Sequence, residues 1–176
     1  MNELHPVLAT RFSPLRFAAA GPLADEQVDL LLEAARWAPS AGNSQPWAFF
    51  TARPGEPDHA RLLKHLAPSA AAWAPDAGLL VVTVAHRFVE DTDWAYSEFA
   101  DYDLGQAVAH LTIQAQAMGL ACRQFRAFDL DALTADLAPS AGWQVVSMIA
   151  VGRPADSGAA RRERRTIADL LAAPWV

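Results

Sequence analysis

The chain offers little thiol or amine chemistry, because its 176 residues include one cysteine, Cys122, and one lysine, Lys64. A single cysteine cannot form a disulfide within the chain, so the fold must be held by its core. Cys122 lies in an apolar, strand-like segment, where a small core residue is more common than a nucleophile. Arginine supplies the remaining basic charge, a preference that genome composition explains without a functional reason.

Long apolar runs, targeting signals and common catalytic motifs are also missing. No uninterrupted apolar run reaches about 18 residues, so no transmembrane helix is expected. The N-terminus lacks a basic stretch followed by an apolar core, which predicts no signal peptide and a cytoplasmic protein. The five histidines show no metal-ligand spacing, and the chain has no nucleophile elbow, P-loop or dinucleotide-binding glycine motif.

The charge balance is acidic, with a formal net charge of −6 and a sequence pI near 5.2. This balance argues against nucleic acid as a partner. An apolar share of 52% is enough for a substantial core, and the length is typical of one domain spanning residues 1–176. The carboxylates are scattered, and Asp101 and Asp103 are interpreted as the solvated end of a helix.

The hydrophobic pattern alternates between helix-like and strand-like segments. Helical spacing predicts helices over residues 25–37, 57–66, 93–118 and 129–137, with Asp25 and Asp129 as caps and Pro39, Pro68 and Gly119 as ends. Apolar runs predict strands over residues 47–51, 79–85, 120–128 and 143–151. Taken alone, this alternation is typical of a parallel doubly wound sheet, although the pattern cannot determine strand order.

A polar loop from Ala38 to Trp47 separates the first predicted helix from the first predicted strand. Ser40, Asn43 and Gln45 supply hydroxyl and amide groups that could bind something polar. On local chemistry alone, a well-capped surface turn is the more common interpretation of such a Pro/Ser/Gly/Asn cluster.

Five segments resemble, in order, motifs of the nitroreductase family of FMN-dependent oxidoreductases. The polar loop resembles that family's P-S-x-x-N-x-Q-P-W signature, and residues 11–17 resemble its N-terminal R-x-S-x-R-x-F segment. The other three are residues 102–120, similar to its central helix, residues 124–129, similar to Q-x-x-G-F-D, and residues 152–154 at a strand end. No single segment is specific, so the order of all five across the chain carries the resemblance.

The resemblance implies an α+β fold with a mixed, largely antiparallel sheet flanked by helices and built as an intertwined homodimer. We follow it rather than the parallel-sheet interpretation. It also implies FMN as cofactor, with NAD(P)H and a small organic acceptor such as a nitroaromatic or a quinone as partners. No side chain is expected to be catalytic, because the flavin N5 would do the chemistry. The alternative is a flavin-binding or cofactor-lost family member without turnover, acting as a binding module.

The positions matching the family's cofactor-binding residues are Arg11, Phe12, Ser13, Leu15, Pro39, Ser40, Ala41, Asn43, Arg126, Ala127, Arg162 and Arg164. The arginines near both termini would hold the phosphate, because a guanidinium can form two hydrogen bonds to it at once. Arg165 is the alternative if the register of the tail differs. The polar loop would reach the partner's flavin, and the backbone of residues 126–127 would face N5.

Aromatic residues before and after the long helix are candidates for the wall of a substrate pocket: Trp94, Tyr96, Phe99 and Phe125. Flat apolar side chains suit such a wall, although at helical spacing they are equally expected in a core. Three positions depart from the family pattern. Leu15 stands where a cation is expected, Ala70 where asparagine is common, and Ala127 where glycine is usual. Each departure predicts weaker FMN binding.

Overall fold

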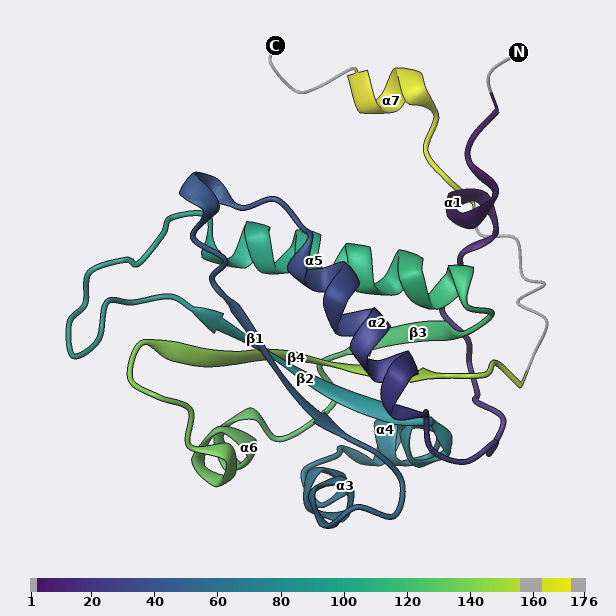
Figure 1. Cartoon of the computed structure of the whole chain (residues 1–176), viewed down its shortest axis with the longest axis horizontal. Coiled ribbons are helices and arrows are strands. Elements are labelled where there is room, and N and C mark those ends of the chain that lie inside the picture. Colours follow the sequence, from purple (N-terminus) through teal and green to yellow (C-terminus); the bar gives the residue numbers. More distant parts are fainter. Residues whose placement is uncertain (1–2, 156–162, 172–176) are drawn as a thin grey trace.

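A sheet of four strands forms the centre of the computed structural model, which describes residues 3–155 and 163–171. The strands are β1 Trp47–Ala52, β2 Leu79–His86, β3 Ala121–Phe125 and β4 Trp143–Gly152. Their order is β1-β2-β4-β3, and each neighbouring pair is antiparallel (Figure 1). The expected α+β class with a largely antiparallel sheet is therefore confirmed, and the parallel arrangement suggested by the alternation alone is wrong.

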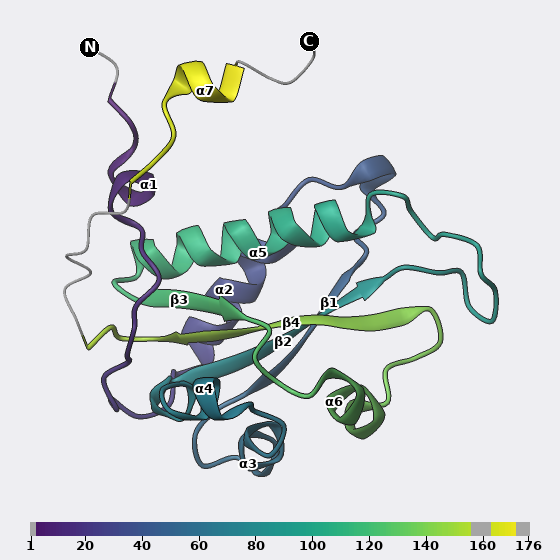
Figure 2. The same cartoon turned by 180° about the vertical axis from the view of Figure 1, so that it is seen from behind.

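Helices cover both faces of this sheet. They are α1 Pro6–Thr10, α2 Asp25–Arg36, α3 Pro57–Leu63, α4 Pro68–Ala71, α5 Ala100–Ala117, α6 Leu130–Leu137 and α7 Ile167–Leu171, with 3-10 turns η1 Ala41–Asn43 and η2 Ala74–Asp76. Helices α2 and α5 lie on one face, and α3, α4 and α6 lie on the other (Figures 1 and 2). Helices α1 and α7 lie beyond α5, away from the sheet.

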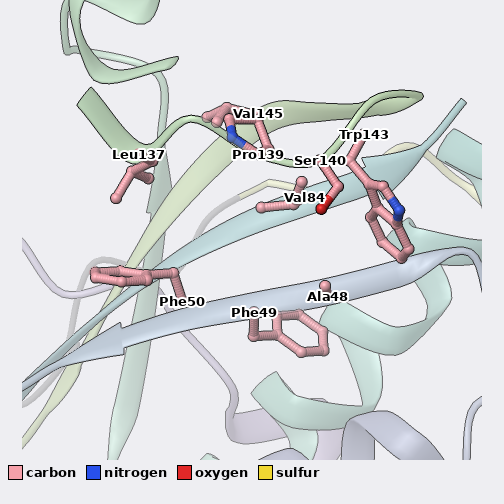
Figure 3. Close-up of a pocket in the computed structure, with 9 residues that line it drawn as sticks. All are labelled: Ala48, Phe49, Phe50, Val84, Leu137, Pro139, Ser140, Trp143 and Val145. Atoms are coloured by element: carbon pink, nitrogen blue, oxygen red, sulfur yellow. The ribbon is translucent and has the colours of Figure 1, made fainter. Parts of the chain in front are cut away.

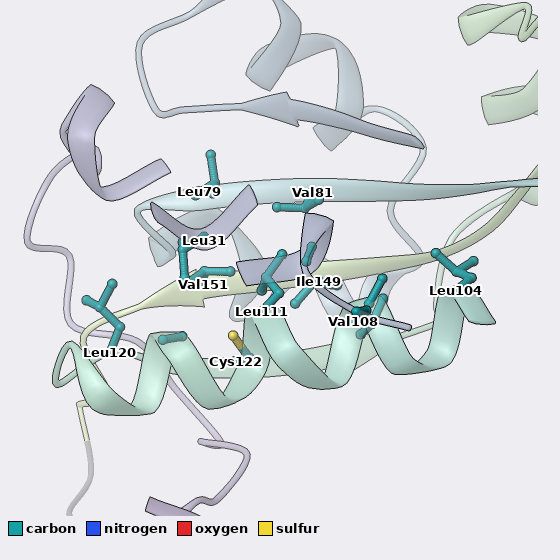
Figure 4. Close-up of a cluster of buried hydrophobic side chains, with 14 of the residues drawn as sticks. Leu31, Leu79, Val81, Leu104, Val108, Leu111, Leu120, Cys122, Ile149 and Val151 are labelled. Atoms are coloured by element: carbon teal, nitrogen blue, oxygen red, sulfur yellow. The ribbon is translucent and has the colours of Figure 1, made fainter. Parts of the chain in front are cut away.

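The central strand β2 is apolar on both faces because both faces are covered. Leu79 packs under α2 and α5 together with Leu111 (Figure 4), whereas its neighbour Leu80 faces the opposite core with Leu62 of α3. Burying one such aliphatic side chain contributes about 1.5–3 kcal/mol. The alternating pattern that usually identifies an antiparallel strand is therefore absent from the sequence.

The long helix begins at Ala100, so its predicted start at residue 93 is wrong. The preceding segment is extended, because Tyr96 donates its N–H to the carbonyl of Arg87 at 2.8 Å and Ala95 forms a bridge with Phe88. These backbone bonds hold the segment in an extended conformation, although the spacing of its aromatic residues is helical. The predicted end at Gly119 is close to the observed one, and the φ of +72° there suits glycine.

The helix boundaries near Pro68 and at Asp25 also differ from the prediction. Helix α3 ends at Leu63 because Leu66 bridges to Phe128, and Pro68 begins helix α4 rather than only stopping the helix before it. At the other cap positions, Asp129 accepts the Ala132 N–H as predicted, whereas Asp25 is the first residue of α2 and not its cap. Across residues 3–155 and 163–171, no helix combines the length and hydropathy needed to cross a bilayer.

Candidate functional site

A buried carboxylate fixes the polar loop between α2 and β1. Asp103 of α5 is 1% exposed, and its Oδ2 accepts the backbone N–H of Ala41 at 3.0 Å. The interpretation of Asp103 as a solvated residue is therefore wrong, because it turns inward to satisfy a loop amide. Within the loop, the Gln45 N–H donates to Ser40 Oγ at 3.0 Å. The loop is consequently held at both ends.

The loop presents its remaining groups outward. Pro39, Ala41 and Asn43 are exposed, and Ser40 is half-buried. Asn43 has a φ of +57°, in the left-handed region that asparagine tolerates better than most residues. All four positions predicted to bind a cofactor thus lie together on one accessible turn.

Three of the four predicted pocket residues lie in the neighbouring loop between β2 and α5. Tyr96 stacks on His86 with ring centroids 3.8 Å apart and donates its hydroxyl proton to the Ser44 carbonyl at 3.2 Å. Trp94 is 78% exposed, and Phe99 is also exposed. This loop therefore leans on the polar loop and adds exposed aromatic surface beside it.

The fourth predicted pocket residue, Phe125, packs elsewhere. It lies at the end of β3, edge-on to Trp73 with ring centroids 5.0 Å apart. Phe128 is its second aromatic neighbour, at 6.3 Å. Within one chain, the structure therefore places Phe125 with the core under α4 and not with the loop aromatics.

The N-terminal segment runs along the end of β4. Phe17 is buried and bridges to Pro154, and the Ala155 N–H donates to the Arg16 carbonyl at 3.1 Å. Upstream of this contact, Arg11, Phe12 and Ser13 are half-buried, whereas the Leu15 side chain is 65% exposed. These contacts therefore anchor the segment on the C-terminal side of the positions predicted to face a phosphate.

Arg123 is a residue that the sequence reasoning missed. Its Nη1 donates to the Leu15 carbonyl at 3.0 Å, and its guanidinium stacks on the Trp73 ring at 3.9 Å. An arginine within an otherwise apolar strand pattern was the available signal. This contact ties β3 to the N-terminal segment and places a positive charge between them.

The neighbouring thiol has no catalytic character. Burial raises the pKa of Cys122 to about 12, and a hydrogen bond from Thr112 and the charge of Arg11 oppose that rise only in part. The thiol stays protonated at neutral pH, so Cys122 is a core residue, as predicted. Nor do the residues in the described ranges form any His, Cys, Asp or Glu group suited to a metal.

The segment after β3 keeps two backbone donors available. Ala127 uses its carbonyl to accept the Ala67 N–H at 3.0 Å, and Asp129 donates to the His65 carbonyl at 2.8 Å. The amide N–H groups of Arg126 and Ala127 donate to no acceptor within the described part of the chain. A ligand with an acceptor atom could occupy both.

The C-terminal arginines are not brought to the N-terminal segment by a contact within residues 3–155 and 163–171. Arg164 donates to the carbonyl of its neighbour Glu163 at 3.1 Å, and Arg165 donates to the Asp169 carbonyl at 2.7 Å. Arg162 lies outside the described residues. The predicted phosphate grip by arginines from both ends of the chain therefore stays a prediction.

A separate apolar hollow of about 260 Å³ opens between β1 and the segment before β4 (Figure 3). Phe50, Val84, Leu137 and Trp143 line it, and Ser140 supplies one hydroxyl. It contains none of the residues predicted to bind a cofactor, and it offers few polar groups to orient a ligand.

Comparisons with known proteins point to one family. The model of the nitroreductase family matches residues 8–153 of the chain. The search of curated proteins found no match to the chain. A solved oxidoreductase containing FMN is 27% identical with a TM-score of 0.81, over 88% of this chain and 79% of that one. A structure from Desulfovibrio desulfuricans, named as a nitroreductase and solved with FMN, is 28% identical with a TM-score of 0.79, over 97% of both chains.

More distant structures share the fold. A nitroreductase family protein from Clostridium difficile is 18% identical over 100% of both chains, with a TM-score of 0.77.

We predict that Asp103→Leu destabilises the protein more than Asp103→Asn does. Leucine leaves the Ala41 N–H without its acceptor, which should lower the free energy of unfolding by about 1–3 kcal/mol. Asparagine keeps an acceptor oxygen and should cost less. Urea unfolding followed by circular dichroism measures both variants.

The matched control is Asp101→Asn, two residues away on the same helix. Asp101 is exposed and pairs with Arg87, and such surface pairs contribute only about 0–1 kcal/mol. Equal losses for the leucine and asparagine variants of Asp103 would show that the hydrogen bond to the loop has no energetic role.

Proposed function

The chain belongs to the nitroreductase family, and on that premise we propose that it is an FMN-dependent oxidoreductase. NAD(P)H supplies the hydride, and a small organic compound such as a nitroaromatic or a quinone accepts it. The observation that carries the proposal is the family match over residues 8–153, which includes every motif segment except the C-terminal arginines and the last residue of the strand end. A cytoplasmic location belongs to the same proposal and rests on the sequence.

The described residues offer the donors that FMN needs. Arg11 and Ser13 can hold a phosphate with charge-assisted hydrogen bonds. The two N–H groups at Arg126 and Ala127 suit a ring nitrogen that accepts a hydrogen bond. The polar loop adds Ser40 and, on its exposed side, Asn43. The donor set therefore fits FMN in kind.

Two of the family departures have structural consequences for this fit. Ala70 is fully buried in α4 and lacks the side-chain amide that asparagine would offer to a flavin edge. Leu15 carries no charge, so the cation at this end of the segment must come from another residue. Because both positions are expected to weaken FMN binding, they favour the second candidate function, a flavin-binding or cofactor-lost family member without turnover that acts as a binding module.

FMN, when bound, supplies the hydride chemistry at its ring N5. The chain's own residues bind and orient. Asp103 holds the polar loop through the Ala41 N–H, and the N–H groups of residues 126–127 would donate to the ring. The exposed aromatic surface of Trp94 and Phe99 gives a planar acceptor a surface to stack on and displaces water.

The first test is the absorbance spectrum of the purified protein, followed by oxidation of NADPH and NADH with a quinone or a nitroaromatic. We expect flavin bands and acceptor-dependent turnover. A protein that binds flavin but oxidises neither nucleotide would favour the binding module. A protein that neither carries nor takes up FMN would end the oxidoreductase proposal and leave the cofactor-lost alternative.

A homodimer with two sites at its interface is part of the proposal. The exposed polar loop needs a flavin held by another subunit, and the exposed Ile167, Leu170 and Leu171 of α7 need a partner surface. We expect light scattering at micromolar concentration to give twice the 19.0 kDa mass of the chain. An obligate interface should bury more than roughly 2,000 Å². A monomer under these conditions contradicts the shared sites.

The flavin affinity should depend on the charge at position 15. Leu15→Arg adds a cation where the family has one, and in a partly solvated site this should tighten FMN binding by about 1 kcal/mol. Leu15→Gln is the uncharged control of similar length. If Arg16 instead supplies that charge, Leu15→Arg will gain nothing and Arg16→Ala will weaken binding. Flavin titrations in which none of these variants differs would remove the N-terminal segment from the site.

A further inference from the structure

A hollow of about 830 Å³ lies beside the outer edge of β4. It exists because β3 is shorter than β4. Strand β3 ends at Phe125, opposite Met148, whereas β4 begins at Trp143. The edge of β4 from residue 143 to 147 is therefore not covered by β3, and α6 forms the facing wall.

The charges that line this hollow are unevenly compensated. Arg87 forms two hydrogen bonds of 2.9 Å to the carboxylate of Asp101 and donates to Gln144 Oε1 at 2.6 Å. Its charge is therefore paired, and three of its five N–H donors are used. Asp131, in the first turn of α6, is the one carboxylate among the described residues that line the hollow.

Arg126 is the other arginine of the lining, and it is exposed. Its guanidinium lies over the Phe128 ring, 4.9 Å from the centroid, which restricts where the long side chain can point. Within residues 3–155 and 163–171 it forms no ion pair, including with Asp131. As far as the described residues show, the hollow thus has one oriented guanidinium whose donors are available.

We propose that Arg126 binds the carboxylate of an anionic acceptor in this hollow, so that the substrate is an organic acid rather than a neutral compound. The planar fork of a guanidinium matches a carboxylate with two parallel hydrogen bonds. The carboxylate takes no part in the chemistry and serves for recognition. This inference rests on the proposed function, because the backbone of residues 126–127 is assigned to the flavin N5 and places Arg126 beside the reacting end.

The probes are 4-nitrobenzoate and 4-nitrobenzamide, which have similar shapes and differ in charge. The first measurement is calorimetric titration of the purified protein with each compound, without a reductant. We expect the acid to bind about tenfold more tightly than the amide, and Arg126→Gln to abolish that difference. Asp131→Asn removes a repelling charge and should tighten the acid alone.

The control variant is Arg36→Gln, which changes the net charge equally. Arg36 is exposed on α2 and paired with Glu33, away from the hollow. It should keep the preference for the acid. A loss of preference in Arg36→Gln equal to that in Arg126→Gln would mean that only the overall charge of the protein is sensed, and it would overturn the inference.

The second measurement is turnover of the same two compounds with NADPH, with the bound flavin quantified in every variant. We expect the ratio of kcat/KM values, acid over amide, to fall about tenfold in Arg126→Gln. Turnover without a preference, or with one that survives Arg126→Gln, overturns the inference and leaves the proposed function standing. Conversely, Arg126-dependent binding of the acid by a protein without flavin would support the anion site and contradict the proposed function.

Discussion

The pairing of β2 with β4 is the constraint on which the rest of the molecule depends. Both strands are covered on both faces, and their register brings His86 opposite Trp143. These two rings stack with centroids 4.7 Å apart, and Tyr96 stacks on the other side of His86. Tyr96 in turn donates its hydroxyl proton to the Ser44 carbonyl, which links the polar loop to these stacked rings. One strand pairing therefore positions both loops of the candidate site.

The same pairing contains its one irregularity next to the open edge of the sheet. The register shifts between Thr83 and Val84, where β4 has an extra residue. Beside this shift, Ser147 donates its N–H to the Thr83 hydroxyl at 3.0 Å and its own hydroxyl lies 2.8 Å away, so the buried Thr83 hydroxyl is hydrogen-bonded. A bulge bends its strand and increases the local twist. Here it lies in the part of β4 that β3 leaves uncovered.

Much of the fold could be predicted from the sequence, but strand direction could not. The strand from Leu79 onward is apolar without alternation, which is typical of a parallel sheet, and only the family resemblance indicated otherwise. Helix boundaries set by local chemistry were more predictable than those set by distant backbone bonds. The aromatic spacing before Ala100 is helical, but long-range backbone bonds keep that segment extended. Asp129, which caps a helix, and Gly119, which ends one, act locally and were identified from their own chemistry.

The sequence pointed to candidate site residues whose own chemistry suits a ligand. It did not point to the charged side chains that hydrogen-bond to a distant main-chain group. Asp103 and Arg123 each hold a main-chain group, at separations of 62 and 108 residues along the chain. Any residue other than proline at position 41 would offer the same N–H, and any residue at position 15 the same carbonyl, so the sequence at those positions contains no trace of the partner. A buried or stacked charge must nevertheless find a compensating group. A charged residue in an apolar helix face or strand is therefore the signal to search for. Here Asp103 holds the polar loop and Arg123 holds the N-terminal segment, while exposed groups remain for a ligand.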